Sequence, residues 1–412
     1  MLRFYDAPQG ANIQPNAGKN AADSGLEPNY KSSGNDAFAI ITAAWTQWFS
    51  SQSNIVFNTP LDVRINDIVA AIFDDTNNGL PLNECFVFAN LYLLEQNLSK
   101  DIALKPFYEK LPKHYKRANN EMLATAISIA AAKKQGYKFI GEKSVIDKLY
   151  GKSIWAKPWN TAGPDYLLDR ANEFCFLEVK SHAGEYARKP VYFEKYKTQS
   201  VNAKLTPSNS LPQSNSGNQA TTLNIRHVLS YGNLPNAVHA GTTAPASVQW
   251  FNNADSTQKI FPSELWLMKI AIVFCQFFYQ LTKTDFPIRL SDIDDSSYLE
   301  RAAYKMQSTN DFILLTQPQT GREHICAVHR TTIIFSLKAL NIFRTFRAGS
   351  RVDEQDIYSV FSEIESLENY AVDSLTIGRE TYHTGFVSAT GVFSLSRNPI
   401  KPRQTRDSRR RG

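Results

Sequence analysis

Cysteine is scarce in this sequence and is never paired at close spacing. The chain has four cysteines in 412 residues, and none forms a CxxC motif: Cys85, Cys175, Cys275 and Cys326. This spacing argues against a disulfide framework and against a zinc ribbon. Each cysteine lies in apolar sequence, where a free thiol behaves as a small buried hydrophobe. A reducing cytoplasm is the compartment we expect.

Long hydrophobic runs are also missing. The first residues, MLRFYDAPQG, contain no apolar segment of the kind that a signal peptide requires. The longest apolar stretch, Leu265 to Leu281, is interrupted by Lys269 and Gln276 and is short for a bilayer span. We therefore expect a buried core helix there and no association with a membrane.

An excess of charge is absent over most of the chain. The net charge is only +6, but the last residues, KPRQTRDSRRRG, combine Asp407 with a cluster of basic side chains: Lys401, Arg403, Arg406, Arg409, Arg410 and Arg411. Such a tail attracts polyanions without reading their sequence. A solubilising, disordered terminus is the alternative interpretation.

A chain of 412 residues is too long for one compact core, so two or three structural units are expected. We find no internal repeats, and the pattern predicts an α/β (α+β) fold. The expected units are an irregular N-terminal arm (1–35), a helical N-terminal region (36–115), an α/β core (116–250) with a polar loop at 206–222, a mixed, mainly helical C-terminal region (251–398) and a basic tail (399–412).

Helices and strands are predicted from hydrophobic periodicity and from capping residues. In the central unit, a helix from Asn120 to about Gln135 would be capped by Asn119 or Asn120 and would end at Gly136. We expect strands near 137–140, 165–169, 174–180, 224–229, 312–315 and 325–335, and further helices near 263–282, 336–347 and 353–368.

The segment from Gly163 to Ser181 predicts a β-hairpin that brings two acidic side chains together. If the turn is centred on Ala171-Asn172, the hairpin register places Asp165 directly opposite Glu178. Directly opposed side chains have Cβ atoms about 4.5–5.5 Å apart, and two like charges there weaken a sheet. A divalent cation between them would remove the repulsion, because hard cations take carboxylate oxygens.

The alternation of side chains along a strand places Lys180 beside this pair of acids. Glu178 and Lys180 are two residues apart and share one face of the strand, while Val179 points to the other face. An acid at the end of an apolar strand is energetically unfavourable unless it has a partner. A metal held by Asp165 and Glu178 could activate water, and Lys180 could orient that water or stabilise developing phosphorane charge. These residue types suit phosphodiester hydrolysis.

The motif Pro164-Asp165 followed by Glu178-Val179-Lys180 resembles the PD-(D/E)xK nuclease superfamily, over roughly 116–240. The resemblance implies a restriction-endonuclease-like fold, a mixed four-stranded sheet flanked by helices, with Mg²⁺ (or Mn²⁺) on the motif acids. It also implies a metal-site role for Glu121 on the preceding helix. Lys195 and Gln199 would approach the scissile phosphate, as basic residues or Gln do in the helix after the hairpin.

Non-catalytic interpretations also exist for Glu121, Lys195 and Gln199. Glu121 could simply be an acid favoured by the helix macrodipole in the first turn. Lys195 and Gln199 could be a solvated helix face.

The sequence therefore predicts a cytoplasmic Mg²⁺-dependent DNA endonuclease. By analogy with superfamily members that carry large unfamiliar flanks, restriction or anti-phage defence is the expected setting. The flanks would serve substrate choice, homo-oligomer formation or contacts with a partner protein. Two alternatives remain: a nucleic-acid-binding or scaffold protein that does not cleave, and an RNase.

Overall fold

The computed structural model describes the parts of the chain that carry the central sheet and most of its covering helices. The described residues are 2–7, 56–57, 61–64, 67–68, 71, 102, 110–151, 163–171, 173–181, 199–200, 220–233, 246–282, 312–314, 324–367, 374–377, 380–387 and 392–396.

The large sheet has seven strands and mixed direction. Its strands lie in the order β2-β1-β7-β6-β5-β4-β3. Neighbours run antiparallel except at β1/β7 and β5/β6, which are parallel. The strands are β1 (Arg3–Ala7), β2 (Val56–Phe57), β3 (Phe139–Glu142), β4 (Tyr166–Arg170), β5 (Glu173–Ser181), β6 (Thr221–Asn233) and β7 (Ser247–Ile260).

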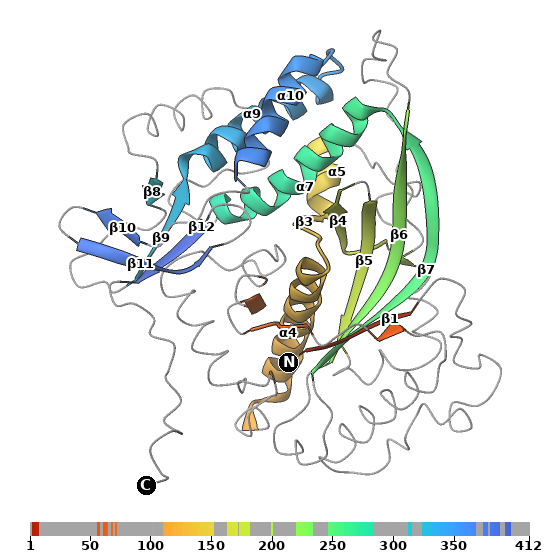
Figure 1. Cartoon of the computed structure of the whole chain (residues 1–412), viewed down its shortest axis with the longest axis vertical. Helices are drawn as coiled ribbons and strands as arrows, with labels where there is room; N and C mark the ends of the chain where they lie inside the picture. Colours follow the sequence, from red (N-terminus) through yellow and green to blue (C-terminus); the bar gives the residue numbers. More distant parts are fainter. Residues whose placement is uncertain are drawn as a thin grey trace.

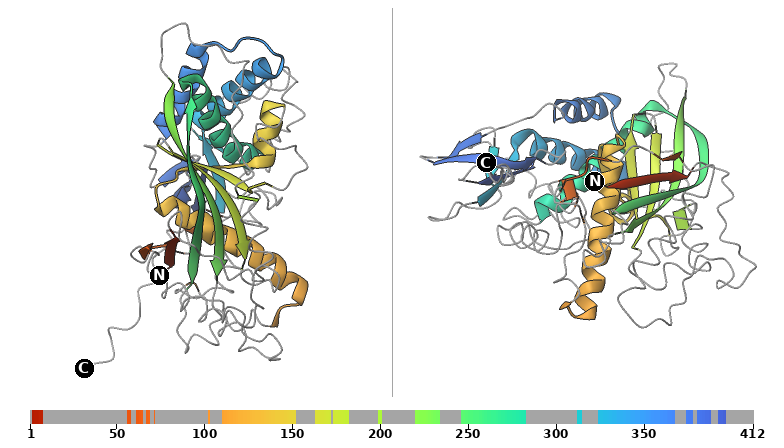
Figure 2. Two further views of the ribbon diagram at one scale, coloured as in Figure 1. Left: turned by 90° about the vertical axis from the view of Figure 1, so that its right-hand side faces the viewer. Right: turned by 60° about the horizontal axis from the view of Figure 1, so that its bottom comes forward.

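A second, smaller sheet is antiparallel throughout. It contains β8 (Phe312–Leu314), β9 (His324–His329), β10 (Ser374–Ile377), β11 (Glu380–Val387) and β12 (Val392–Ser396), in the order β10-β11-β12-β9-β8. Helices lie between the two sheets (Figures 1 and 2): α7 (Pro262–Thr282), α9 (Arg330–Arg347) and α10 (Glu354–Leu367). Buried residues from Leu2 to Val360 form one continuous hydrophobic cluster.

Helix α4 (Lys113–Lys134) covers one face of the large sheet and contacts β5, β6 and β7. On that face the Ser230 hydroxyl of β6 donates to the Ser128 hydroxyl of α4 at 3.0 Å. Gly232 lies so close to Ala124 that an added Cβ would stand 2.6 Å from its carbonyl oxygen. Even-numbered residues at the end of β6 therefore face α4.

Helix α7 covers the opposite face, with α5 (Lys143–Tyr150) beside it. An added Cβ on Gly141 of β3 would stand 3.1 Å from the Cα of Ile272 in α7, so helix and strand are in close contact. Residues of α7 from Leu267 to Cys275 are almost all buried, which confirms the predicted core helix. None of the described helices combines the length and apolarity that a membrane crossing requires.

The start of α4 differs from the prediction. The helix begins at Lys113, after Pro112 as N-cap, and not at Asn119 or Asn120. No side chain caps it and its first turn has no acid, so the sequence held no standard start signal at this point. Its end agrees with the prediction: Gln135 is the C-cap, and Gly136 follows with a φ of 92°, a conformation that suits glycine.

Other elements also differ from the expected organisation. Arg3–Ala7, expected in an irregular arm, forms β1, and Val56–Phe57, expected in a helical region, forms β2. The expected boundary at 250/251 falls inside β7, which pairs along the whole of β6. Residues from Arg330 onward are helical in α9, so the strand expected at 325–335 ends at His329. The polar loop up to residue 219 and the basic tail lie outside the described residues.

Candidate active site

The hairpin of β4 and β5 has the predicted register. Tyr166 pairs with Leu177 and Arg170 pairs with Glu173, with the turn at Ala171 between them. Arg170 and Glu173 form an ion pair at 2.9 Å beside the turn. Asp165 is the residue before Tyr166, and Glu178 is the residue after Leu177. Continuing the register by one pair therefore places Asp165 opposite Glu178.

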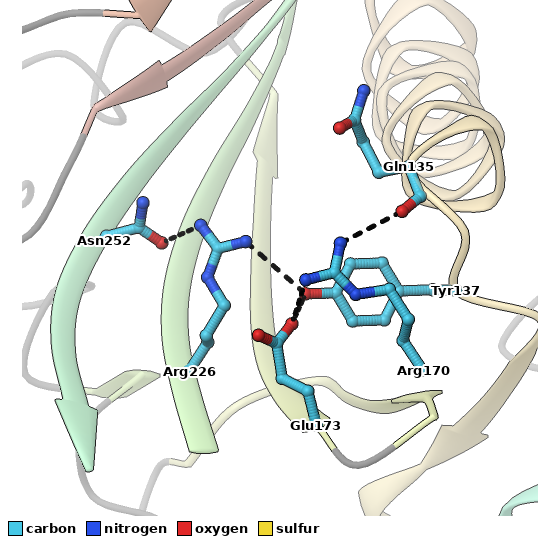
Figure 3. A network of polar contacts seen from close by, with 6 residues as sticks. All are labelled: Gln135, Tyr137, Arg170, Glu173, Arg226 and Asn252. Carbon is cyan, nitrogen blue, oxygen red and sulfur yellow. Dashed lines mark hydrogen bonds and ion pairs between the residues drawn. The ribbon is translucent and has the colours of Figure 1, made fainter. Parts of the chain in front are cut away.

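A polar network fixes the turn end of this hairpin to its surroundings (Figure 3). Arg170 donates to the Gln135 carbonyl at the end of α4 (3.1 Å) and stacks over the Tyr137 ring. The Tyr137 hydroxyl donates to Glu173 and accepts a long hydrogen bond from Arg226 of β6. Burial raises the pKa of Tyr137 well above its usual value, so it stays a phenol and a donor. Arg226 also donates to Asn252 of β7 (2.6 Å), so the network links α4, β4, β5, β6 and β7 around the turn.

Helix α7 holds the turn from the opposite face. Lys269 Nζ donates to the Ala171 carbonyl at 2.8 Å and lies 3.5 Å from Asp169 Oδ1, with both side chains largely buried. Because the side chains of Lys269 and Asp169 are largely buried, Lys269→Met should lower the free energy of unfolding by about 3 kcal/mol, the low end of the range for removing one partner of a buried ion pair. Urea denaturation measures this change.

A double variant separates the charge effect from packing. Lys269→Met combined with Asp169→Asn removes both charges, so part of the lost stability should return. Lys259→Met is the matched control, because Lys259 is exposed on β7. If Lys269→Met and Lys259→Met change the stability equally, the turn does not depend on the contact with α7.

Asp165, Glu178 and Lys180 come together at the other end of the hairpin. Lys180 Nζ lies 2.5 Å from Glu178 Oε1 and 3.7 Å from Asp165 Oδ2. The Val179 backbone N–H donates to Asp165 Oδ2 at 2.9 Å, which ties the carboxylate to the strand opposite. An ammonium group thus bridges the two acids, and a cation is the natural occupant of this space.

Glu178 is the buried member of the group. Its side chain is 2% exposed, against 35% for Asp165 and 23% for Lys180. The pKa of Glu178 is raised to about 8: burial is the largest cause, the neighbouring Asp165 also raises the pKa, and the Lys180 ammonium lowers it. Glu178 Oε2 is buried with no hydrogen-bond partner among the described residues. A buried acceptor left in this way costs about 1–3 kcal/mol.

These donors fit Mg²⁺. Magnesium takes hard oxygen ligands and is held in many sites by one or two carboxylates together with water and substrate phosphate. Asp165 and Glu178 supply two adjacent carboxylates, and Glu178 Oε2 is an oxygen that a metal or its water would satisfy. Within the described part of the chain, no group of three or more His, Cys, Asp or Glu side chains could hold a metal ion, so the fit rests on two protein ligands.

Glu121 does not join the pair, contrary to expectation. It is exposed on α4, two turns after the helix begins, and not in the first turn. Helix α4 packs on the sheet face of Ser230 and Gly232, whereas Glu178 and Lys180 pair with Leu229 and Tyr231 and so point to the other face. The prediction failed because the helix start was misplaced and the helix face was unknown.

The two phosphate-contact candidates have different outcomes. Lys195 lies outside the described residues. Gln199 is helical and half-buried, and its Oε1 is buried without a hydrogen-bond partner in the described part of the structure, so it is not a solvated surface position. A residue that the sequence reasoning missed is His227, buried on β6 and bonded to the backbone of Ser200. The available signal was a histidine within an apolar strand.

Comparison with known proteins gives no independent assignment: no family model, no curated protein and no solved structure matches this chain. The site must therefore be judged on its own geometry.

Proposed function

We propose that this protein is a metal-dependent nuclease that hydrolyses phosphodiester bonds in DNA, with its active site at Asp165, Glu178 and Lys180. One observation carries the proposal: a lysine bridges two adjacent carboxylates, one of them buried with an oxygen that lacks a partner. The mixed sheet flanked by helices is compatible with the restriction-endonuclease-like fold that the PD-(D/E)xK resemblance implies.

Each side chain has a separate task. Asp165 and Glu178 would hold Mg²⁺, which polarises a phosphoryl oxygen and lowers the pKa of the attacking water when bound. The Lys180 ammonium, next to both carboxylates, would orient the nucleophilic water or stabilise charge on the phosphorane oxygens.

The basic C-terminal tail supports a polyanionic substrate. Its six Lys and Arg residues would add electrostatic affinity without sequence preference. DNA is the proposed substrate and RNA the alternative. Restriction or anti-phage defence is the setting that the family resemblance favours, and Mn²⁺ is expected to replace Mg²⁺.

The test is cleavage of supercoiled plasmid, linear duplex, single-stranded DNA and structured RNA, with Mg²⁺, Mn²⁺ or EDTA. Asp165→Asn is the informative variant, because an amide oxygen can still accept from the Val179 N–H while the charge is lost. We expect EDTA to stop cleavage and Asp165→Asn to slow it by at least about 100-fold, the upper range for outer partners of metal sites.

Glu121→Gln is the matched control, since it removes an exposed carboxylate on the opposite side of the sheet. It should keep wild-type activity. Equal cleavage by the wild type and Asp165→Asn would show that the active site does not include Asp165 as proposed. Binding of DNA without cleavage under any metal would point to a binding protein on this fold, and cleavage restricted to RNA would move the substrate assignment.

A further inference from the structure

His227 lies on the same face of the sheet as the proposed active site. In the parallel ladder of β5 and β6, Phe176 pairs with His227 and Glu178 pairs with Leu229. Paired residues of a ladder share a face, and so do residues two apart along a strand. His227 therefore lies on the same face of the sheet as Glu178, beside Phe176, which is two residues before Glu178 on β5.

Two contacts hold the His227 ring. It is stacked on Phe176, with ring centroids 5.0 Å apart and 24° between the ring planes. Its Nδ1 lies 2.8 Å from the backbone carbonyl oxygen of Ser200. A carbonyl can only accept, so Nδ1 must carry the proton in this contact. His227 is 6% exposed, and both partners fix the orientation of its ring.

Ser200, the hydrogen-bond partner of His227, belongs to the connection between β5 and β6. Parallel neighbouring strands need a connection that crosses over one face of the sheet. The described part of this connection, Gln199–Ser200, is helical and lies over the face of His227. Ser200 is fully buried there, and Gln199 is its direct neighbour.

Gln199 brings a second unsatisfied acceptor to this side of the molecule. Among the described residues, four buried side-chain atoms lack a hydrogen-bond partner, and they include Glu178 Oε2 and Gln199 Oε1. Buried acceptors are normally satisfied. Gln199 Oε1 therefore needs a hydrogen-bond donor, and its neighbour Ser200 lies against the sheet face that also carries Glu178.

We propose that His227 is a positioning residue: it fastens the Gln199–Ser200 segment to the active-site face and so sets where the Gln199 carboxamide stands. The inference rests on the proposed nuclease function and deepens it. Through the Ser200 carbonyl, His227 fixes the backbone next to Gln199, and Gln199 Oε1 then accepts a hydrogen bond from water on the active-site face of the sheet. His227 itself does not touch the reacting atoms.

Two matched variants test the contact. His227→Phe keeps a ring to stack on Phe176 but has no donor, whereas His227→Asn has an amide N–H close to the position of Nδ1. We expect His227→Phe to lower kcat by about 10- to 100-fold, the range for outer partners of a metal site. KM for DNA and the affinity for Mn²⁺ should stay near wild type, and His227→Asn should restore most of kcat.

A double variant tests whether His227 acts through Gln199. Gln199→Met removes the amide at nearly equal volume and should lower kcat about as much as His227→Phe. The combination should be no slower than the slower single variant, since both changes disable one unit. Effects that multiply would overturn the proposal, because His227 would then act independently of Gln199.

Hydrogen exchange keeps this test separate from the nuclease proposal. Loss of one hydrogen bond should raise amide exchange in peptides that contain Gln199 and Ser200 by about 10-fold in His227→Phe and not in His227→Asn. If the wild type cuts no substrate, the nuclease proposal fails, and exchange alone decides the positioning. Unchanged exchange in His227→Phe would overturn it.

Discussion

Glu178→Gln is expected to stabilise the metal-free protein at alkaline pH, by on the order of 4 kcal/mol at pH 9, while abolishing cleavage. The wild type keeps a buried carboxyl at 2% exposure, and its pKa is raised from 4.5 to about 8. Glutamine has nearly the same shape and cannot ionise, so it avoids burying a negative charge. Stability and activity should therefore move in opposite directions.

The sign of the pH dependence follows from the direction of the pKa shift. Between pH 4.5 and about 8 the folded wild type keeps a proton on Glu178 that the unfolded chain has lost. Stability from this group is therefore complete below pH 4.5 and declines as pH rises to about 8. The gap between Glu178→Gln and the wild type should be small at pH 5 and should widen up to pH 9. Urea denaturation in EDTA at pH 5, 7 and 9 measures it.

Metal and a control variant sharpen this experiment. Mg²⁺ should stabilise the wild type at pH 9, where Glu178 is ionised, and should have little effect on Glu178→Gln. Glu121→Gln, which changes an exposed carboxylate on α4, should follow the wild type in both series. A constant gap from pH 5 to 9 would contradict the assignment of a raised pKa to Glu178.

The Lys180 ammonium is expected to be needed for cleavage and dispensable for metal binding. Lys180→Met keeps the apolar stem and removes the charge. Cleavage should fall by about 100- to 1,000-fold, as when one preorganised donor to a developing oxyanion is lost. Binding of Mn²⁺ at pH 9 should persist, because Asp165 and Glu178 remain and a competing cation 2.5 Å from Glu178 Oε1 is gone.

Parallel measurement of cleavage and Mn²⁺ binding separates the roles. Asp165→Asn should lose both, whereas Lys180→Met should lose only cleavage. Lys138→Met on the short segment before β3 serves as a control for the loss of a lysine, since it lies outside the site group. If Lys180→Met loses metal binding and cleavage together, the lysine organises the carboxylates and is not a catalytic residue.

The hairpin could be predicted from the sequence because its information is local. An opposite-charge pair at Arg170 and Glu173 marks the turn, and strand alternation then fixes every partner up to Asp165 and Glu178. The hairpin register was confirmed for this reason. The raised pKa of Glu178 also follows from an acid that ends a buried apolar strand.

Elements defined by distant contacts were not predictable. The middle of β7, from Asn252 to Thr257, is polar and has low strand propensity, and its pairing with β6 forms the strand. The face on which α4 packs depends on the close approach of Ala124 to Gly232, far along the chain. Glu121 was therefore placed wrongly, and the partnership of His227 with Ser200 could not be inferred from periodicity.

The pairing of β1 with β7 has a consequence for how the chain reaches its native state. Arg3 pairs with Ser247, so β1 cannot join the sheet until β7, which lies beyond the middle of the chain, has formed. Such high contact order predicts slow folding, whereas the β4–β5 hairpin can form early from adjacent residues. A growing chain would then carry the β4–β5 hairpin before α7, which contacts β3 and β4, has been made. The part of the hairpin that α7 covers in the native state would stay exposed to solvent until synthesis has passed Thr282.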